Sequence, residues 1–302
     1  ETVNIVHARS RAPAWACYFA SFLTRRVFVT TFHGTYNFKS KFKKFYNSIM
    51  LKAKLTIAGS NFIFSHINEN YSEYLSKEKK LRVIFRGINV DYYNPKNISM
   101  LKQEKLKQEW NLFSNKFTIL LPGRLTYWKG QEKFIESLNI LIEDYNFTNF
   151  QAIILGSDQG RKVYAKKLMN LVERYNLNKK IKFIKHCNEM PLAYSLADVV
   201  VSTSIEPEAF GRVSVEAQSM GKPIIASNIG GSKETIINKK TGFLYKHDDP
   251  RELAKSLNTV IQLSPDELKS IGNEGRKNIT KKFDVETMCQ SNLKEYRRLI
   301  KN

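Results

Sequence analysis

Cysteines, long apolar runs and closely paired acidic residues are all scarce in this sequence of 302 residues. The three cysteines, Cys17, Cys187 and Cys289, lie too far apart for a disulfide framework or a zinc knuckle, which favours a reducing compartment. No apolar run approaches the roughly 18 residues of a membrane-spanning helix. No Asp-x-Asp triplet occurs, so we expect no metal ion clamped on a diphosphate. Hydrophobic residues still make up 42%, which excludes a wholly disordered chain.

Acidic residues are scarce as a class, and residues 2–68 contain none. Lys and Arg number 49 against 28 Asp and Glu, a formal net charge of +21. This excess implies an anionic partner such as nucleic acid, a membrane surface or a phosphorylated substrate. A general preference of the genome for lysine would explain the total, but not so long a segment without acids. The basic residues of that segment are Arg9, Arg11, Arg25, Arg26, Lys39, Lys41, Lys43, Lys44, Lys52 and Lys54.

Short apolar runs alternate with helical patterns such as Lys129–Tyr145 and Arg161–Tyr175. This alternation predicts the α/β class, with doubly wound parallel sheets covered by helices on both faces. A polar, Lys-rich stretch divides the runs into two series near residue 112, so we expect two Rossmann-like domains facing a cleft. The expected strands are Thr2–His7, Arg26–Phe32, Leu55–Ala58 and Arg82–Phe85, then Phe117–Leu121, Phe150–Leu155, Ile181–Ile184, Val199–Ser202, Pro223–Ala226 and Gly242–Tyr245.

Polar residues follow the expected strands at the ends where parallel sheets bind ligands. The pattern predicts a binding cleft along these ends. The residues concerned are His7, His33-Gly34, Ser60, Gly123-Arg124, Gly156-Ser157-Asp158 and Ser202-Thr203-Ser204.

Two glutamates flank the start of a predicted helix, Arg212 to Met220. Glu208 lies in the preceding loop and Glu216 about one turn inside the helix, with Phe210-Gly211 between them. A helix that starts after glycine leaves backbone N–H groups available to a phosphate. One carboxylate could then accept the hydroxyls of a ribose and the other could reach a sugar. The alternative is a surface helix with ordinary glutamates.

A second motif, Pro122 to Gly130, places two cations in a short loop after a strand. Arg124 and Lys129 suit a diphosphate, whose charge must be neutralised when a bond to it breaks. A solvated loop is the alternative. The paired glycines Gly230-Gly231 could let main-chain amides approach a ligand, although a plain turn explains them equally well.

Together these blocks resemble the retaining glycosyltransferases of family GT4, which have the GT-B fold. Glu208 and Glu216 match the family's E-x7-E motif, and His33-Gly34 looks like its His-Gly pair. The phosphate loop of the family is matched by Gly123, Arg124, Lys129 and Gly130. Further matches in the family's order are Ala197-Asp198-Val199, Gly221-Lys222-Pro223, Gly230-Gly231 with Glu234, Thr241-Gly242-Phe243, and Arg86 to Asp91 with Pro95.

The resemblance implies roles for these residues. Arg124 and Lys129 would hold the donor diphosphate, Glu216 the ribose, and Glu208 the donor sugar, with the departing phosphate acting as base for the acceptor hydroxyl. His33 would contact the sugar near the reacting carbon. A purely structural role is the alternative for His33, and also for His7. Main-chain N–H groups near Phe210, Gly211 and Val215 would add to the phosphate site, and His186 would line the base pocket. No cofactor or metal is implied, and the donor would be a UDP-, GDP- or ADP-sugar.

The resemblance also implies the organisation of the chain. Residues 1–112 would form the acceptor-side domain, residues 113–281 the nucleotide-sugar domain, and residues 282–302 a helix crossing back to the first domain. The family opens with a strand and a Gly-rich loop, whereas the first glycine here is Gly34. We therefore expect an N-terminal domain that lacks its first strands.

A basic segment with an aromatic stripe lies in the acid-free region. Phe38, Phe42, Phe45 and Ile49 have helical spacing, and lysines fill the other face. Such a helix can lie at a membrane interface. The acceptor would then be a lipid-linked or envelope glycan, and the chain cytoplasmic, peripheral on the inner face of the membrane. The alternative is a stripe that faces the core while the lysines are solvated.

Three other functions stay open at this point. A nucleic-acid-binding protein would fit the charge, but no recognisable module is present. Another GT-B enzyme, an epimerase or a phosphorylase of sugar nucleotides, would share the motifs. A non-catalytic remnant would bind nucleotide sugar without turnover. The sequence names neither the base, nor the sugar, nor the acceptor.

Overall fold

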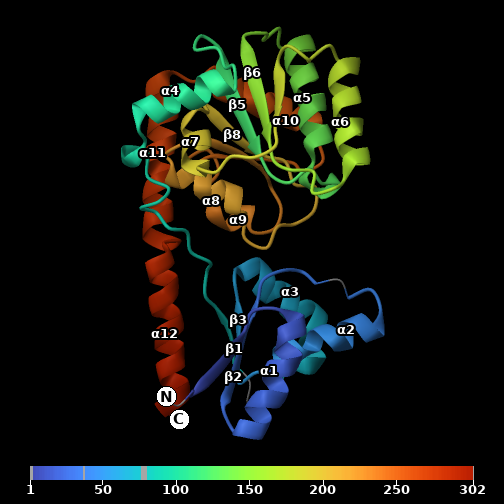
Figure 1. The fold of residues 1–302 in the computed structure, drawn as a ribbon, viewed down its shortest axis with the longest axis vertical. Helices are drawn as coiled ribbons and strands as arrows, with labels where there is room; N and C mark the ends of the chain where they lie inside the picture. The colour runs from blue at the N-terminus through green and yellow to red at the C-terminus, as the bar shows by residue number, and fades with distance from the viewer. Residues whose placement is uncertain (1–2, 37, 76–79, 302) are drawn as a thin grey trace. The chain divides into compact units, whose positions relative to one another are not determined.

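A computed structural model describes residues 3–36, 38–75 and 80–301 of the chain (Figure 1). The chain divides into two compact units. Unit 1 contains the chain up to Gly87, the short segment Glu208–Phe210, and the chain from Phe283 onward. Unit 2 contains Ile88–Pro207 and Gly211–Lys282.

Unit 1 is built on a parallel sheet with the strand order β1-β2-β3-β4. Consecutive residues of a strand point to opposite faces, so Phe28 and Val29 of β2 enter different hydrophobic clusters. α1 and α3 contribute to the cluster of Phe28, whereas α12 packs Leu299 against the cluster of Val29. The elements of unit 1 are β1 (Ile5–Ala8), α1 (Arg11–Thr24), β2 (Val27–Phe32), α2 (Lys41–Ser48), η1 (Ile49–Leu51), β3 (Leu55–Ala58), α3 (Asn61–Tyr71), η2 (Ser72–Tyr74), β4 (Lys80–Val83) and α12 (Val285–Lys301).

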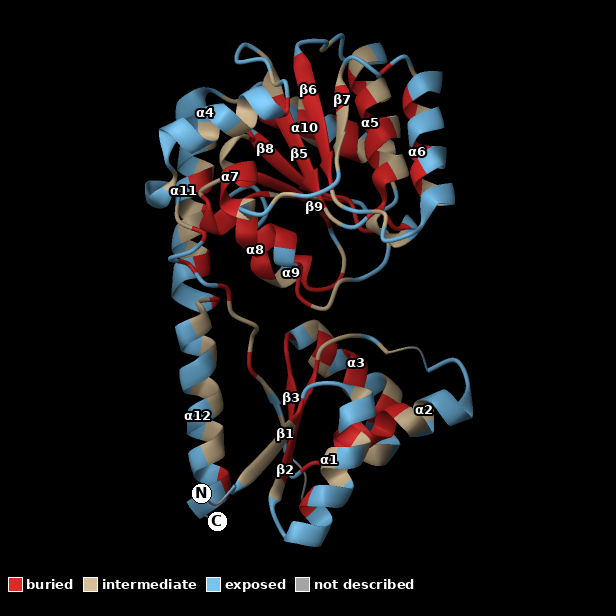
Figure 2. Ribbon diagram, in the orientation of Figure 1, coloured by how far each residue is buried: buried red, intermediate tan, exposed pale blue. Residues whose placement is uncertain are grey.

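Unit 2 contains a six-stranded parallel sheet in the order β10-β9-β8-β5-β6-β7. Its central strands β6 and β8 are buried along their whole length, and β5 is buried from its second residue onward (Figure 2), because helices cover both faces. The strands are β5 (Phe117–Pro122), β6 (Phe150–Leu155), β7 (Ile181–Ile184), β8 (Val199–Ser202), β9 (Ile224–Ser227) and β10 (Phe243–Tyr245). The helices are η3 (Pro95–Asn97), α4 (Met100–Glu109), η4 (Tyr127–Lys129), α5 (Gln131–Glu143), α6 (Lys162–Arg174), α7 (Met190–Ser195), α8 (Arg212–Ser219), α9 (Ser232–Thr235), α10 (Pro250–Ile261) and α11 (Pro265–Lys282).

The expected α/β class with parallel sheets is confirmed, and most strand boundaries lie within two residues of the prediction. The chain runs outward from β5 through β6 to β7, and then returns to place β8 on the other side of β5. The strand order therefore reverses between β5 and β8. In open α/β sheets, ligands bind outside the carboxyl ends of the strands at such a switch point.

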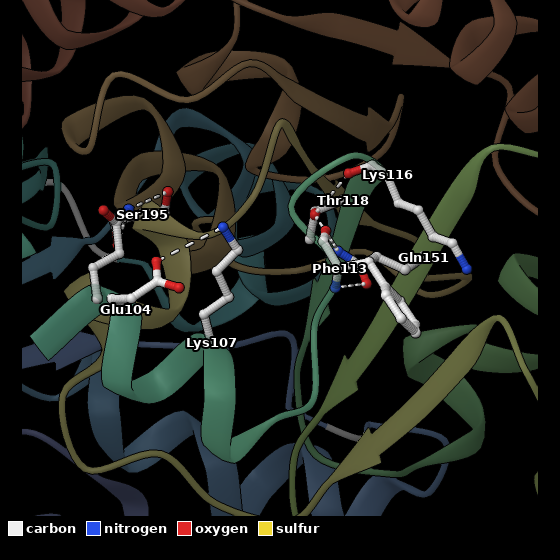
Figure 3. A network of polar contacts seen from close by, with 8 residues as sticks. Glu104, Lys107, Phe113, Lys116, Thr118, Gln151 and Ser195 are labelled. Carbon is white, nitrogen blue, oxygen red and sulfur yellow. Dashed lines mark hydrogen bonds and ion pairs between the residues drawn. The ribbon is translucent and has the colours of Figure 1, made fainter.

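The division expected near residue 112 lies instead at Gly87, so residues 88–112 belong to unit 2. The polar helix α4 packs on α7, with Lys102 Nζ 2.9 Å from the Glu189 carboxylate and Gln103 Nε2 3.1 Å from Ser195 Oγ. The following segment is fixed by Gln151, whose side chain exchanges two hydrogen bonds of 2.9 Å with the Phe113 backbone (Figure 3). The sequence predicted that the first domain ends after this polar stretch, but these side-chain contacts hold the stretch to unit 2.

Glu208–Phe210 is a second difference, because these residues were expected in the nucleotide-sugar domain and group with unit 1. Ser60 Oγ donates to the Ala209 carbonyl at 2.6 Å, and the Phe210 ring lies 5.7 Å from that of Phe283. Phe283 and the residues that follow it, including α12, also lie in unit 1.

Candidate functional site

The loop after β5 and the loop after β8 are in direct backbone contact at the switch point of unit 2. Thr203 Oγ1 donates to the Lys129 carbonyl at 2.8 Å, and the Ile205 N–H donates to the Trp128 carbonyl at 2.9 Å. Gly130 adopts a φ of 67°, and a Cβ at this position would lie 2.0 Å from the Thr203 carbonyl oxygen. Only glycine permits this approach. The close contact fixes the loop that carries Arg124 and Lys129.

Both predicted diphosphate cations lie in this loop. The Arg124 side chain is exposed, while its carbonyl accepts a hydrogen bond of 2.9 Å from Gln131 Nε2. Lys129 Nζ lies 4.5 Å from the centroid of the Trp128 ring, and its methylene chain runs beside Gly123. The Gly123 N–H donates to the Leu155 carbonyl at 2.8 Å, which holds the start of the loop against the end of β6.

The amino terminus of α8 has no side-chain cap. Its N-cap residue, Gly211, has a φ of 78°, and a Cβ there would lie 3.1 Å from Ser232 Oγ. The helix itself offers no acceptor to the N–H groups of its first residues, Arg212 and Val213, so they can bind an anion. The Val215 N–H is different, because it donates to the Gly211 carbonyl at 3.3 Å inside the helix. Val215 was expected to offer its N–H to phosphate, and the structure does not support that part of the prediction.

The Glu216 carboxylate is buried and has partners on both oxygens. Tyr194 donates its hydroxyl to Oε2 at 2.8 Å, and Arg212 donates to Oε1 through Nη2 at 2.8 Å and Nε at 3.1 Å. Burial, and secondly the Glu216 charge, raise the pKa of the Tyr194 hydroxyl well above its usual value. The Glu216 charge also raises the pKa of the Arg212 guanidinium. Tyr194 thus fixes the carboxylate from the protein interior, whereas the Arg212 side chain is 66% exposed and can be displaced.

Two further residues of this cluster escaped the sequence analysis. Tyr194 lies on α7, 22 residues before its partner Glu216. Tyr93 also lies close to that carboxylate, since burial and then the Glu216 charge raise the pKa of its hydroxyl. In the sequence, Tyr194 stands just before the Ala197-Asp198-Val199 motif, and this position could have drawn attention to it. The position does not predict the hydrogen bond between Tyr194 and Glu216.

His33 and His7 lie in unit 1 beside a cavity of about 350 Å³, whose lining also includes Arg9 and Arg86. His7 is satisfied on both ring nitrogens, at 2.5 Å from the Tyr296 hydroxyl and 2.7 Å from Thr31 Oγ1. This geometry agrees with a structural role for His7.

The His33 ring differs from that of His7. Its Nδ1 is buried and has no hydrogen-bond partner among the described residues. Burial, and then the charges of Arg86 and Arg9, lower the pKa of His33 to about 4. His33 is therefore a neutral ring that can accept or donate a hydrogen bond.

The remaining predicted site residues, Glu208, Phe210 and His186, are divided between the two units. Glu208 is half-buried and Phe210 is buried, both in unit 1. His186 is exposed after β7, where its Nε2 lies 2.6 Å from Asn188 Oδ1. It lines a cavity of about 330 Å³ with residues of α4 such as Lys105 and Glu109. Unit 2 thus brings the cationic loop together with the loop after β8, and places the start of α8 beside α9.

In the part of the chain that the structure describes, no helix has the length and apolar character needed to cross a membrane. Within the same residues, no group of three or more His, Cys, Asp or Glu side chains is arranged to hold a metal ion.

Comparison with known proteins supports the resemblance drawn from the motifs. The family model described as "Glycosyl transferases group 1" matches residues 102–278, and "Glycosyltransferase Family 4" matches residues 1–92. A spore coat protein SA of Bacillus subtilis is 25% identical over 97% of this chain and 78% of its own length. A capsular polysaccharide biosynthesis glycosyltransferase of Staphylococcus aureus is 27% identical over 73% of this chain. The alignment spans 58% of that relative, and 43% of a D-inositol 3-phosphate glycosyltransferase of Corynebacterium glutamicum.

Solved structures agree with these matches. A glycosyltransferase of Rickettsia africae superimposes with a TM-score of 0.91 at 38% identity, over 99% of this chain and 78% of that one. Anabaena HepE, solved in complex with UDP-glucose, superimposes with a TM-score of 0.85 at 26% identity, over 98% of this chain and 79% of that one. The fold, the order of the motifs and both family matches lead to one conclusion: the chain belongs to the group 1 glycosyl transferases of the GT-B fold.

Proposed function

We propose that this chain transfers a sugar from a UDP-sugar to a hydroxyl of a glycan or lipid-linked acceptor, with retention of configuration and without a metal ion. The observation that carries the proposal is the contact between the loops after β5 and β8, which fixes two cations at the switch point of unit 2. UDP is the favoured nucleotide because HepE, which is 26% identical, was solved with UDP and with UDP-glucose.

Arg124, Lys129 and the start of α8 would bind the donor diphosphate. The two side chains and the N–H groups of Arg212 and Val213 all present positive charge to an anion. Charge grows on the β-phosphate as the bond to the sugar breaks, so the same groups would stabilise the transition state more than the ground state. The departing phosphate would then take the proton of the acceptor hydroxyl.

Glu216 would bind the ribose. Both of its oxygens are engaged in this structure, so the ribose hydroxyls would displace the exposed Arg212 from Oε1 while Tyr194 keeps Oε2 in place. The released guanidinium would then be available to the donor phosphates. This exchange leaves the number of hydrogen bonds to the buried carboxylate unchanged.

Glu208 and His33 would contact the donor sugar. With a pKa of about 4, His33 is uncharged near neutral pH, so it would act as a neutral hydrogen-bonding group. A neutral ring does not repel the positive charge that develops at the reacting carbon.

The three cysteines are free, which agrees with a cytoplasmic protein.

The test is a panel of UDP-glucose, GDP-mannose and ADP-glucose against the full chain, measured as shifts in Tm and as release of the nucleoside diphosphate. We expect UDP-glucose to raise Tm most, because a ligand that binds only the folded state stabilises it. Lys129→Ala should remove most of that shift. Lys166→Ala, an exposed lysine on α6, is the matched control. If no nucleotide sugar shifts Tm, or if Lys129→Ala binds as well as Lys166→Ala, the proposal is wrong. Binding without release of UDP on any acceptor would instead favour the non-catalytic alternative.

A further inference from the structure

Helix α1 exposes an apolar side that nothing in unit 1 covers among the described residues. From Ala12 to Thr24 the helix contains no charged residue, and only Ala14 and Ser21 are buried in the sheet-facing side. Phe22 and Leu23 are 74% and 80% exposed, and Phe19 is also exposed. A helix that is apolar on every side is normally buried. The exposed side of α1 is therefore a candidate surface for a partner to bind.

Helix α2 extends this surface. Phe42 is 76% exposed and Phe45 is also exposed, so the alternative of a core-facing stripe fails for these two residues and holds for Ile49, which is buried. Phe38 lies before the start of α2, with its ring 5.4 Å from that of His66. The Trp15 ring of α1 lies 5.9 Å from that of Phe45 and 6.3 Å from that of Phe19. The two helices thus join their aromatic side chains, and both have exposed outer faces in Figure 2. We call Phe19, Phe22, Leu23, Phe42 and Phe45 the apolar face of unit 1.

Positive charge surrounds the apolar face. Arg25 and Arg26 follow α1 directly, Lys41 and Lys43 flank Phe42, and all four are exposed. No acidic residue occurs between positions 2 and 68, so no carboxylate from this segment neutralises them. The neighbouring Lys44 forms an ion pair with Glu73 at 2.7 Å, and it is not one of these four residues. This charge disfavours a second copy of the chain as partner, because two like-charged faces repel.

We propose that the apolar face docks unit 1 on a bilayer that contains anionic lipid. Exposed phenylalanines beside lysines and arginines are the side chains that enter the boundary between headgroups and acyl chains, while the cations meet lipid phosphates. The inference rests on the proposed function in one respect, because docking would bring the enzyme to its lipid-linked acceptor. Vesicle binding itself requires no donor and no turnover.

The experiment is co-sedimentation of the full chain with vesicles of phosphatidylcholine alone and of phosphatidylcholine with about 30% phosphatidylglycerol as the anionic lipid. We expect binding to the anionic vesicles that weakens as salt rises. Arg26→Gln with Lys43→Gln should weaken it about 25-fold, at about fivefold per charge. Phe22→Ser with Phe42→Ser should weaken it by at least about tenfold. Met100→Ser with Leu101→Ser, equally exposed residues on α4 of unit 2, should leave it unchanged.

Several results would overturn the inference. These are no vesicle binding, equal binding to both vesicle types, or a Phe22→Ser, Phe42→Ser variant that binds like the unaltered chain. Self-association that this variant abolishes would assign the face to a second copy instead. The UDP-glucose affinity of each variant is measured in parallel, both to verify folding and to separate the two proposals. Loss of vesicle binding with intact nucleotide binding supports the docking face, whereas vesicle binding without any nucleotide binding refutes only the proposed function.

Discussion

Replacing Gly130 by alanine tests whether the contact between the loops after β5 and β8 builds the diphosphate site. A non-glycine residue at a φ of 67° costs about 1 kcal/mol of backbone strain. The new Cβ would also lie 2.0 Å from the Thr203 carbonyl oxygen, so the loops must separate by more than 1 Å. That movement breaks the hydrogen bonds from Thr203 Oγ1 to Lys129 and from Ile205 to Trp128, at about 1 kcal/mol each. The total is about 3 kcal/mol.

Gly160 supplies the matched control. Its φ is 83°, but a Cβ there would meet nothing within 4 Å, so Gly160→Ala carries only the backbone strain of about 1 kcal/mol. For a unit of this size each kcal/mol lowers Tm by about 2 to 4 °C. Calorimetry should therefore show a drop of about 6 to 12 °C for Gly130→Ala and about 2 to 4 °C for Gly160→Ala.

The same pair of variants separates stability from binding. Gly130→Ala should weaken UDP-glucose binding at least about tenfold at a temperature where the chain is folded, because the displaced loop carries Lys129. Gly160→Ala should bind like the unaltered chain. Equal losses of Tm in the two variants, or unchanged binding in Gly130→Ala, would refute the idea that this backbone contact positions the cations.

Three further predictions concern the residues around the site. Tyr194→Phe leaves Glu216 Oε2 buried without its donor, and urea unfolding should show a loss of about 2 kcal/mol in the free energy of unfolding. If the losses caused by Tyr194→Phe and Glu216→Gln simply add in a double-mutant cycle, the two side chains do not interact. Arg124→Ala should raise the Kd of UDP by about tenfold and flatten its salt dependence, as titration calorimetry would record. The folded pKa of about 4 for His7 and His33 lies below the unfolded value of 6.5, so the unfolded chain binds more protons between these limits. The free energy of unfolding should therefore fall as pH drops from about 6.5 to about 4 and stay constant above this range. If urea unfolding of His33→Asn shows the same dependence on pH as the unaltered chain, the lowered pKa of His33 is wrong.

The sequence was most informative where local pattern and chemistry agree. Strands such as Leu55–Ala58 and Phe150–Leu155 occur where expected, because a buried parallel strand needs a continuous apolar run bounded by polar residues. The same logic located Gly123–Lys129 directly after β5, since ligand-binding loops follow the strands. It failed for residues 88–112, whose polar helix has no buried residue to reveal its attachment to unit 2.

What the sequence by itself determined is the order of strands and helices and the residue types at each strand end, because these depend on periodicity and composition along the chain. The family came from the resemblance of its motifs to those of known glycosyltransferases. Tertiary structure alone decided which residues meet. The fold brings the Tyr194 hydroxyl within hydrogen-bond distance of Glu216 and packs Gly130 against the Thr203 carbonyl. It also leaves Phe22 and Leu23 of α1 exposed to solvent. The physical reason is that an apolar or polar pattern specifies what a side chain prefers as its environment, whereas packing of distant segments decides which neighbour supplies it.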